Sequence, residues 1–174
     1  RYINTEWGAK MFGMYKAHGD PSSVVANFGI AVAHVEYVDE EMLDANGMSS
    51  IMSVPHVVFD LVHAFYPEDF AENTIDWMEV TPEITKLINA FRPIEWTFDQ
   101  FDSNFAIQKI SNDIAQMGIT ETQVYMKTAN AANNRRRAMN FKAALNLGRI
   151  HIPHPTYPTD QSNKRSLELV RQEL

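Results

Sequence analysis

With 174 residues, 45% of them hydrophobic, the chain has the size of one domain with a substantial core, and it contains no membrane-spanning apolar run and no secretion signal. The absence of cysteine excludes disulfides, thiolate zinc sites and a cysteine nucleophile, so any metal must bind oxygen or imidazole. The net charge of −7 is uneven, because residues 125–174 carry +6 and the remainder −13, and such a basic face on an acidic body leaves DNA binding open.

The first half of the chain predicts three consecutive strands. The segment "MFGMYKAH" is the first strand, which stops at Gly19 before the polar residues 20–23. The second strand is "NFGIAVAHVEYV", and the polar, turn-rich segment 39–50 follows it. The third strand, "PHVVFDLVHAFYP", is bounded by Pro55 and Pro67, because proline favours strand ends. Three strands in sequence favour an antiparallel meander.

Helices and strands alternate in the second half. Thr81 as the N-cap and Pro82 at the first helical position predict a helix that ends near Pro93. The segment "IEWTFD" is a fourth strand, which closes on Asp99. A second helix covers residues 102–118, with isoleucines recurring on one face.

One more strand and one more helix complete the pattern. The segment "TQVYMKT" predicts a fifth strand, and "NNRRRAMNFKAALNLG" predicts a third helix that Gly148 ends. We expect this helix to turn Ala138, Phe141 and Leu145 inward. A short extended piece, "RIHIPHPTYP", and the start of a last helix, "KRSLELVRQEL", follow.

This order predicts an α/β domain with a mixed five-stranded sheet, a three-strand meander plus parallel strands, flanked by helices. Right-handed crossover connections place the fourth strand parallel to one of the first three, most simply beside the first. The ends of those two strands are then neighbours. We therefore expect Asp20 and Asp99 to lie side by side, although they are far apart in the sequence.

Two neighbouring carboxylates repel each other unless a cation intervenes. Mg²⁺ and Mn²⁺ prefer oxygen ligands and keep several waters, which suits acids at a solvent-facing strand end. A pair of such ions can activate a water and stabilise the leaving oxygen of a phosphodiester. The layout is therefore compatible with nuclease chemistry, while for any single acid a solvated surface position is the simpler alternative.

Four segments, in this order, resemble one protein family. They are "GDPSS" with "NFGIAVAH", "VVFDLVHAFYP", "IEWTFDQFDSNFAIQKI" and "NNRRRAMNFKAALNLGRIHIP". From about residue 10 onward the chain is similar to the C-terminal nuclease domain of large terminase subunits of tailed bacteriophages, which cut concatemeric DNA and package it. The resemblance implies an RNase H-like fold, one nuclease domain over residues 1–174, and a Mg²⁺- or Mn²⁺-dependent endodeoxyribonuclease.

The resemblance also implies the metal-binding residues. Asp20, in "HGDPSS", matches the family's acid at the end of strand one, and Asp99, in "TFDQF", matches the acid that ends the fourth strand. Both are expected to be catalytic and to hold two Mg²⁺ or Mn²⁺ ions. The family's third acid lies beyond the final basic helix, so we expect it after Leu174, and the late acids Asp160 and Glu173 match poorly. No phosphate-loop motif occurs, so the ATPase half is expected outside this chain.

Cations near the end of the chain are the candidates for DNA contacts. Arg135, Arg136 and Arg137 open a helix, where positive charge opposes the helix dipole, and this favours a role in phosphate binding. Consecutive helical residues point in different directions, so one or two of the three would face DNA. Lys142 and Arg149 could extend the surface. An ordinary solvated helix that carries these cations is the alternative.

The leading hypothesis is a metal-dependent endonuclease domain that cuts concatemeric viral DNA during genome packaging. The resemblance implies double-stranded DNA, the portal and the small terminase subunit as partners, no membrane, and a location in the host cytoplasm with a transient stay at the procapsid. Two alternatives stay open: another RNase H-like nuclease, such as a resolvase or a transposase core, and a catalytically silent module that binds DNA or the portal. Asp60, inside the third strand, is expected to be structural.

Overall fold

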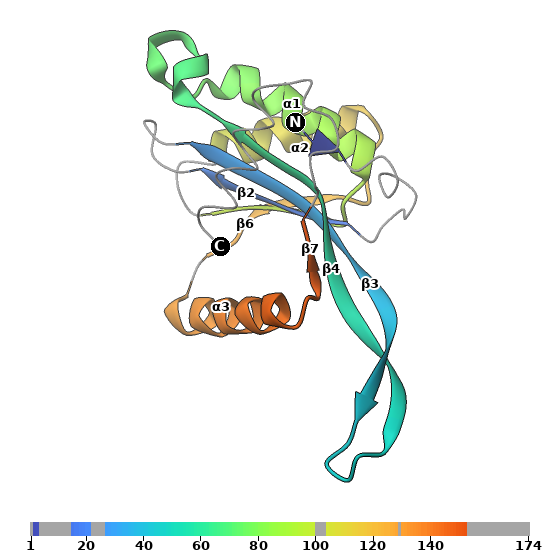
Figure 1. The fold of residues 1–174 in the computed structure, drawn as a ribbon. Coiled ribbons are helices and arrows are strands. Elements are labelled where there is room, and N and C mark those ends of the chain that lie inside the picture. Colours follow the sequence, from blue (N-terminus) through green and yellow to red (C-terminus); the bar gives the residue numbers. More distant parts are fainter. Residues whose placement is uncertain (1, 4–14, 22–26, 100–103, 129, 153–174) are drawn as a thin grey trace.

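The computed structural model describes residues 2–3, 15–21, 27–99, 104–128 and 130–152. In these residues one mixed sheet carries helices α1 and α2 on one side and helix α3 on the other (Figure 1). The strands are β1 (Tyr2–Ile3), β2 (Lys16–Pro21), β3 (Phe28–Leu43), β4 (Ser49–Phe65), β5 (Glu95–Phe98), β6 (Gln123–Met126) and β7 (Ile150–His151). The helices are α1 (Trp77–Phe91), α2 (Asn104–Gln116) and α3 (Ala131–Asn146), and the short 3₁₀ turns η1 (Pro67–Asp69) and η2 (Ala71–Asn73) precede α1.

The strand order β1-β4-β3-β2-β5-β6 confirms the predicted mixed sheet. Strands β2, β3 and β4 are antiparallel neighbours, β5 pairs parallel with β2, and β6 pairs parallel with β5. The two-residue strands β1 and β7 both pair with β4 and extend the five predicted strands. Strand β7 falls in the predicted extended piece, whereas the predicted last helix lies outside the described residues.

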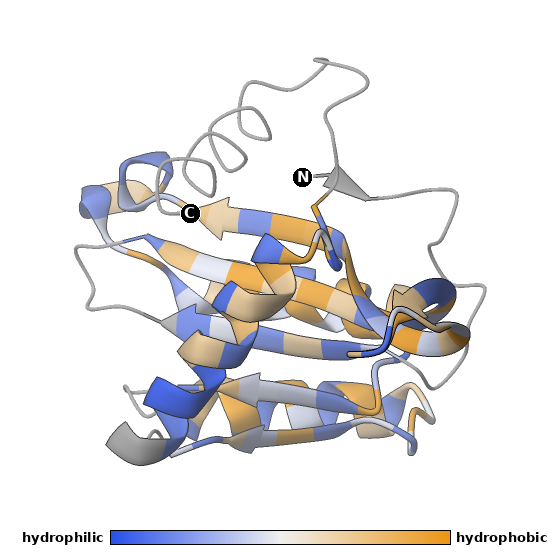
Figure 2. Cartoon of the chain, turned by 60° about the horizontal axis from the view of Figure 1, so that its bottom comes forward, coloured by the Kyte–Doolittle hydropathy of each residue, from blue (hydrophilic) through white to orange (hydrophobic). Residues whose placement is uncertain are grey.

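The hydrophobic core lies between the sheet and the pair of helices α1 and α2. Orange and blue segments are interspersed along the strands in Figure 2, and strand β5 is buried from Trp96 through Phe98. The apolar residues Ile84, Leu87, Ile88 and Phe91 recur along α1 at helical spacing, and all four are buried. Burying apolar area at about 25 cal/mol per Å² makes this layer the main source of stability, and it holds β2 and β5 in place through Ala17, Trp96 and Phe98.

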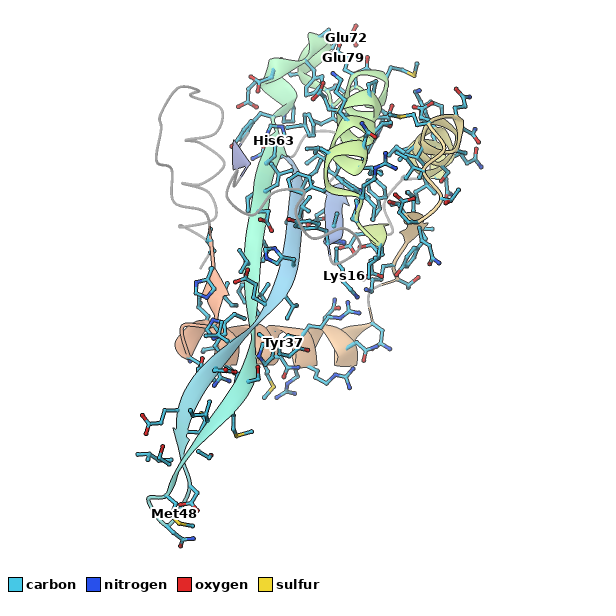
Figure 3. All side chains as sticks on the ribbon, turned by 90° about the vertical axis from the view of Figure 1, so that its right-hand side faces the viewer. Lys16, Tyr37, Met48, His63, Glu72 and Glu79 are labelled. Atoms are coloured by element: carbon cyan, nitrogen blue, oxygen red, sulfur yellow. The ribbon has the colours of Figure 1, made fainter. Side chains whose placement is uncertain are left out.

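The hairpin of β3 and β4 is longer than the sequence predicts. Instead of a loop over residues 39–50, the strand pairing continues to Leu43 and Ser49. The Asp44 carboxylate closes the turn by accepting hydrogen bonds from the backbone N–H groups of Asn46 and Met48, both at 2.8 Å. The distal half of the hairpin projects away from the sheet, and Figure 3 shows Met48 at its tip. Its exposed apolar side chains are Val38, Met42, Leu43, Met48, Ile51 and Met52.

Pro55 lies inside β4 and does not begin it, contrary to the prediction. The backbone N–H of Val57 donates to the Arg149 carbonyl at 2.9 Å, away from β3. The backbone nitrogens of residues two apart in a strand face the same edge of that strand, so the nitrogen of Pro55, like that of Val57, faces away from β3. The missing N–H of proline therefore costs no hydrogen bond to β3, and the strand continues through it.

Helix α1 begins five residues before the predicted start. Asp76 is the N-cap: its side chain accepts the backbone N–H of Met78 at 2.7 Å, and its carbonyl accepts the N–H groups of Glu79 and Val80. The Thr81 hydroxyl donates to the Trp77 carbonyl inside the helix, so Thr81 is no cap.

Helix α3 ends as predicted at a left-handed glycine, Gly148, with φ of 67°. Its predicted inward face is wrong, because Ala138 and Phe141 are exposed and Leu145 is half-buried. The helix stands off the sheet across a pocket instead of packing on it (Figure 1). Among the described residues no helix combines the length and apolarity needed to cross a bilayer.

Candidate active site

The ends of β2 and β5 place Asp20 and Asp99 at neighbouring positions. The parallel register pairs Gly19 with Phe98, and each acid is the next residue along its strand. The backbone N–H of Asp99 donates to the Gly19 carbonyl at 3.3 Å, so the contact between the two chains continues to the acids. Asp20 is exposed and Asp99 is half-buried. The adjacency expected from the topology is therefore present at the level of the backbone.

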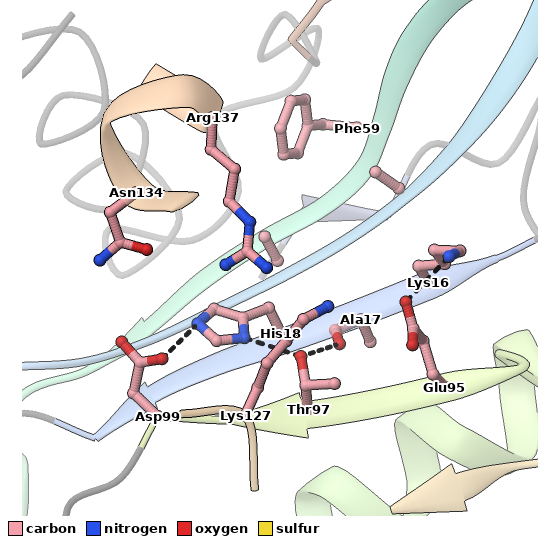
Figure 4. A pocket seen from close by; sticks show the side chains of 12 residues that line it. Lys16, Ala17, His18, Phe59, Glu95, Thr97, Asp99, Lys127, Asn134 and Arg137 are labelled. Carbon is pink, nitrogen blue, oxygen red and sulfur yellow. Dashed lines mark hydrogen bonds and ion pairs between the residues drawn. The ribbon is translucent and has the colours of Figure 1, made fainter. Parts of the chain in front are cut away.

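His18 lies on the same side of the sheet as the two acids. Side chains two apart on a strand share a face, which places His18 with Asp20 on β2. Its Nε2 is 3.8 Å from Oδ1 of Asp99, and its Nδ1 is 2.8 Å from Oγ1 of Thr97 (Figure 4). The sequence analysis missed this histidine, although the spacing His-x-Asp at the end of a predicted strand was a usable signal.

A pocket of about 450 Å³ opens over this face of the sheet. Asp99, His18 and Thr97 line its floor, and Asn134 and Arg137 reach into it from α3 (Figure 4). Its remaining lining residues are Lys16, Ala17, Ala31, Ala33, Phe59, Glu95 and Lys127. The stand-off of α3 from the sheet therefore produces an open cleft, with Asp99, Glu95, Lys16 and Lys127 on the sheet side and Arg137 on the side of α3.

The predicted DNA-contacting cations are not all in one place. Arg137 lines the pocket, whereas Arg135, Arg136 and Lys142 are exposed along α3. Arg149 is engaged elsewhere: its Nη2 donates to Oε2 of Glu40 at 2.6 Å and its Nε donates to Oε1 at 3.3 Å. This ion pair joins the segment after α3 to strand β3 of the hairpin.

The Glu40 carboxylate is the central group of this contact. Besides Arg149, it lies 2.7 Å from Nε2 of His56, whose Nδ1 is 2.8 Å from Nε2 of His151 on β7. Hydrogen bonding by Arg149, and next by His56, holds the pKa of Glu40 below its usual value. Arg149 therefore serves a structural contact between β3, β4 and the segment after α3.

Glu95, which lines the pocket, also has partners. It accepts a hydrogen bond from the Tyr125 hydroxyl at 2.5 Å and lies 2.9 Å from Nζ of Lys16. The Tyr125 hydrogen bond, and next that of Lys16, lower the pKa of Glu95, while the bond to Glu95 raises the pKa of Tyr125. Glu95 is thus an ionised acid whose charge is compensated by Lys16 and Tyr125.

Asp60 is buried away from the strand ends, in agreement with its expected structural role. Val32 pairs with Leu61 and Ala33 with Phe59, so Asp60 is the extra residue of a β-bulge. Its Oδ2 is 2.5 Å from Nδ1 of the buried His34, and burial raises the pKa of its carboxyl group.

The donor set at the ends of β2 and β5 fits a divalent cation. Carboxylate oxygens at a solvent-facing site are the ligands that Mg²⁺ and Mn²⁺ prefer, with water completing the shell. In the part of the chain that the structure describes, no three His, Asp or Glu side chains are gathered closely enough to hold a metal by themselves. Asp160 and Glu173, the late acids, lie outside the described residues.

No protein-family model matches the sequence, and no curated protein matches it either. Solved structures do match. The human cytomegalovirus terminase nuclease domain, soaked with manganese, is 13% identical, with a TM-score of 0.50 over 99% of this chain and 80% of that one. The HK97 bacteriophage large terminase is 12% identical, with a TM-score of 0.48 over 90% of this chain and 32% of that one. RuvC of Thermus thermophilus is 17% identical, with a TM-score of 0.34 over 65% of this chain and 62% of that one.

The match to the cytomegalovirus domain shows a shared fold at very low sequence identity. The fold of this chain is therefore RNase H-like, as the strand order of its sheet also indicates. The chain spans about a third of the length of the HK97 terminase, 32%.

Proposed function

We propose that this chain is a divalent-metal-dependent endonuclease domain that cuts double-stranded DNA, with Asp20 and Asp99 as metal ligands. The observation that carries the proposal is the parallel pairing of β2 with β5, which sets these two acids at adjacent strand ends. The RNase H-like fold, shared with the cytomegalovirus terminase nuclease domain, supports the same conclusion.

The residues at and beside the pocket would have distinct tasks in this reaction. Asp99, in the pocket, and Asp20, at the neighbouring strand end, would hold two Mg²⁺ or Mn²⁺ ions at the solvent-facing edge of the sheet. Bound there, such ions activate a water and stabilise the leaving oxygen of the phosphodiester. Arg137 extends from α3 into the same pocket, where its guanidinium would pair with a phosphate next to the scissile one.

The outer surface of α3 would hold the DNA backbone. Arg135, Arg136 and Lys142 are exposed, and cations that contact phosphates position a duplex without reading its sequence. Arg149 is left out of this surface, because Glu40 holds its guanidinium. Binding through α3 should weaken steeply as salt concentration rises.

The cellular setting is a further part of the proposal. The four sequence segments that resemble phage terminase nuclease domains support concatemeric viral DNA as the substrate, cut while the genome is packaged. In that setting the portal and the small terminase subunit are the protein partners, and the protein acts in the host cytoplasm and transiently at the procapsid.

A plasmid assay tests the nuclease proposal. Supercoiled plasmid is incubated with the protein and Mn²⁺ and compared with the variants Asp20→Asn and Asp99→Asn, with Asp113→Asn on the distant helix α2 as the matched control. We expect nicked and linear DNA from the wild type and Asp113→Asn, and its loss from the two site variants. Nicking that survives both site substitutions would remove the assignment.

The same assay separates the alternatives. Preferential cutting of a four-way junction over linear duplex would favour a resolvase. Salt-dependent DNA binding by the wild type without any cutting would favour a silent DNA-binding module.

A further inference from the structure

We propose that His18 is a direct imidazole ligand of the divalent cation that Asp99 binds. The inference rests on the proposed metal site and deepens it, because it adds a nitrogen ligand to a site otherwise made of carboxylates. It follows from the hydrogen bonds around the ring, from the spacing of two atoms, and from the side of the sheet on which they lie.

The hydrogen bonds of Thr97 determine which ring nitrogen carries the proton. The Thr97 hydroxyl donates to the Ala17 carbonyl at 3.3 Å, which uses its one hydrogen. Oγ1 of Thr97 must then accept the hydrogen bond that joins it to Nδ1 of His18 at 2.8 Å. With this orientation of the hydroxyl, Nδ1 is the nitrogen that donates to Thr97, and Nε2 is the ring nitrogen left to bind a metal.

That nitrogen faces a carboxylate. Nε2 of His18 lies 3.8 Å from Oδ1 of Asp99, which is too long for a hydrogen bond. Two ligand atoms that each lie roughly 2.0–2.2 Å from one ion are at most about 4.4 Å apart, so the spacing of 3.8 Å is within reach of a shared cation. Nε2 of His18 and Oδ1 of Asp99 can each donate an electron pair to a metal ion that lies between them.

The surroundings of His18 match those of histidines that bind metals. Such histidines usually give their second ring N–H to a carboxylate, carbonyl or water, which fixes the ring; here the Thr97 hydroxyl takes that place. Thr97 is itself buried, whereas the side chains of His18 and Asp99 are each 44% exposed. The ring is thus held from behind and accessible from the pocket.

A nitrogen ligand changes which metal the site prefers. Both ions prefer oxygen ligands, but Mg²⁺ demands oxygen and water in near-ideal octahedral geometry, whereas Mn²⁺ is a transition metal that accepts an imidazole nitrogen more readily. His18 should therefore favour Mn²⁺ over Mg²⁺, and Thr97 should act as a positioning residue for its ring.

Pulsed electron paramagnetic resonance on the Mn²⁺-loaded protein tests the proposal without measuring activity. A directly bound imidazole nitrogen gives a resolved nitrogen coupling to the Mn²⁺ electron spin. We expect this coupling in the wild type, its loss in His18→Gln, and its retention in the control Lys16→Gln, which alters the same strand two residues earlier. Bound Mn²⁺ without nitrogen coupling in the wild type, or a coupling that persists in His18→Gln, would overturn the proposal.

Calorimetric titration of Mn²⁺ and Mg²⁺ is the second measurement. Comparing the two ions in one variant separates the loss of a nitrogen ligand from a folding defect, which would weaken the binding of both. We expect Thr97→Val, which keeps the shape of the side chain, to weaken Mn²⁺ binding by roughly tenfold and to change Mg²⁺ binding less. Equal weakening for both ions, with a native circular dichroism spectrum, would contradict a nitrogen ligand.

The failure of this inference can be told from that of the proposed function. Asp99-dependent plasmid cutting with Mn²⁺, but no nitrogen coupling, would refute the role of His18 alone. No Mn²⁺ binding by the wild type would refute both.

Discussion

Gly19 shows how a single residue allows the two candidate metal ligands to meet. It precedes Asp20 and points to the opposite side of the sheet, where a Cβ atom would lie 3.0 Å from the Phe28 ring and 3.1 Å from the Phe98 ring. The absence of a side chain thus lets these two rings fill the core directly behind the strand ends. Gly19 is required here for space, not for an unusual backbone angle.

Replacing this glycine should therefore disturb the core. We expect Gly19→Ala to lower the free energy of unfolding by about 1–3 kcal/mol, because the added methyl group overpacks the two rings. Urea denaturation measures the change. The control is Gly29→Ala on β3, where a Cβ meets nothing within 4 Å and the change should stay within about 0.5 kcal/mol. Equal effects at the two glycines would contradict this account of the packing.

The hydrogen bond between Tyr125 and Glu95 predicts a dependence on pH. The pKa of Glu95 is below its usual 4.5, so its contribution to stability is complete above that value and is lost as the pH falls through the lowered pKa. Removing the hydroxyl in Tyr125→Phe should cost about 1 kcal/mol at pH 7 and flatten the acid side of the stability curve. Thermal melts from pH 7 to pH 3 measure both effects.

The control for this prediction is Tyr37→Phe in the hairpin, where the side chain is 69% exposed. Its stability curve should overlay that of the wild type. If the acid sides of the Tyr125→Phe and wild-type curves ran parallel, the hydrogen bond would not be the source of the lowered pKa.

At the scale of the element, helix α1 depends on a cap that the sequence pattern did not reveal. Asp76 satisfies the N–H of Met78, whereas the more conspicuous Thr81-Pro82 pair lies inside the helix. We expect Asp76→Ala to destabilise the protein by about 1 kcal/mol in urea denaturation. The control is Asp69→Ala in η1, which should change stability by less than about 0.5 kcal/mol. No loss in Asp76→Ala would mean that the helix begins later than Asp76.

Element boundaries were less predictable than element types, and prolines account for much of the difference. Pro55 and Pro82 are ordinary markers of element ends, yet each lies inside an element here. Pro55 is tolerated because its side of β4 does not face β3. Helix α1 continues through Pro82 because its face carrying Ile84 and Leu87 is fully buried, and the packing of that face outweighs a local preference.

At the scale of the whole molecule, topology predicted more of the candidate site than any motif did. The rule for crossover handedness brought Asp20 and Asp99 together from distant parts of the sequence, because it needs only the order and type of elements. The stand-off of α3 could not be predicted in this way, since it depends on how one helix packs. For that reason the sequence did not distinguish among the three arginines as candidates for phosphate contacts. The structure shows that Arg137 lines the pocket, whereas Arg135 and Arg136 do not.

The central claim is that the ends of β2 and β5 form a site for a divalent cation. Calorimetric titration of Mn²⁺ into the wild type, Asp20→Asn and Asp99→Asn tests it most directly, with Asp113→Asn as the control acid on α2. We predict that the wild type and the control bind Mn²⁺ alike and that each site variant binds at least about tenfold more weakly. Wild-type affinity in both site variants would contradict the account.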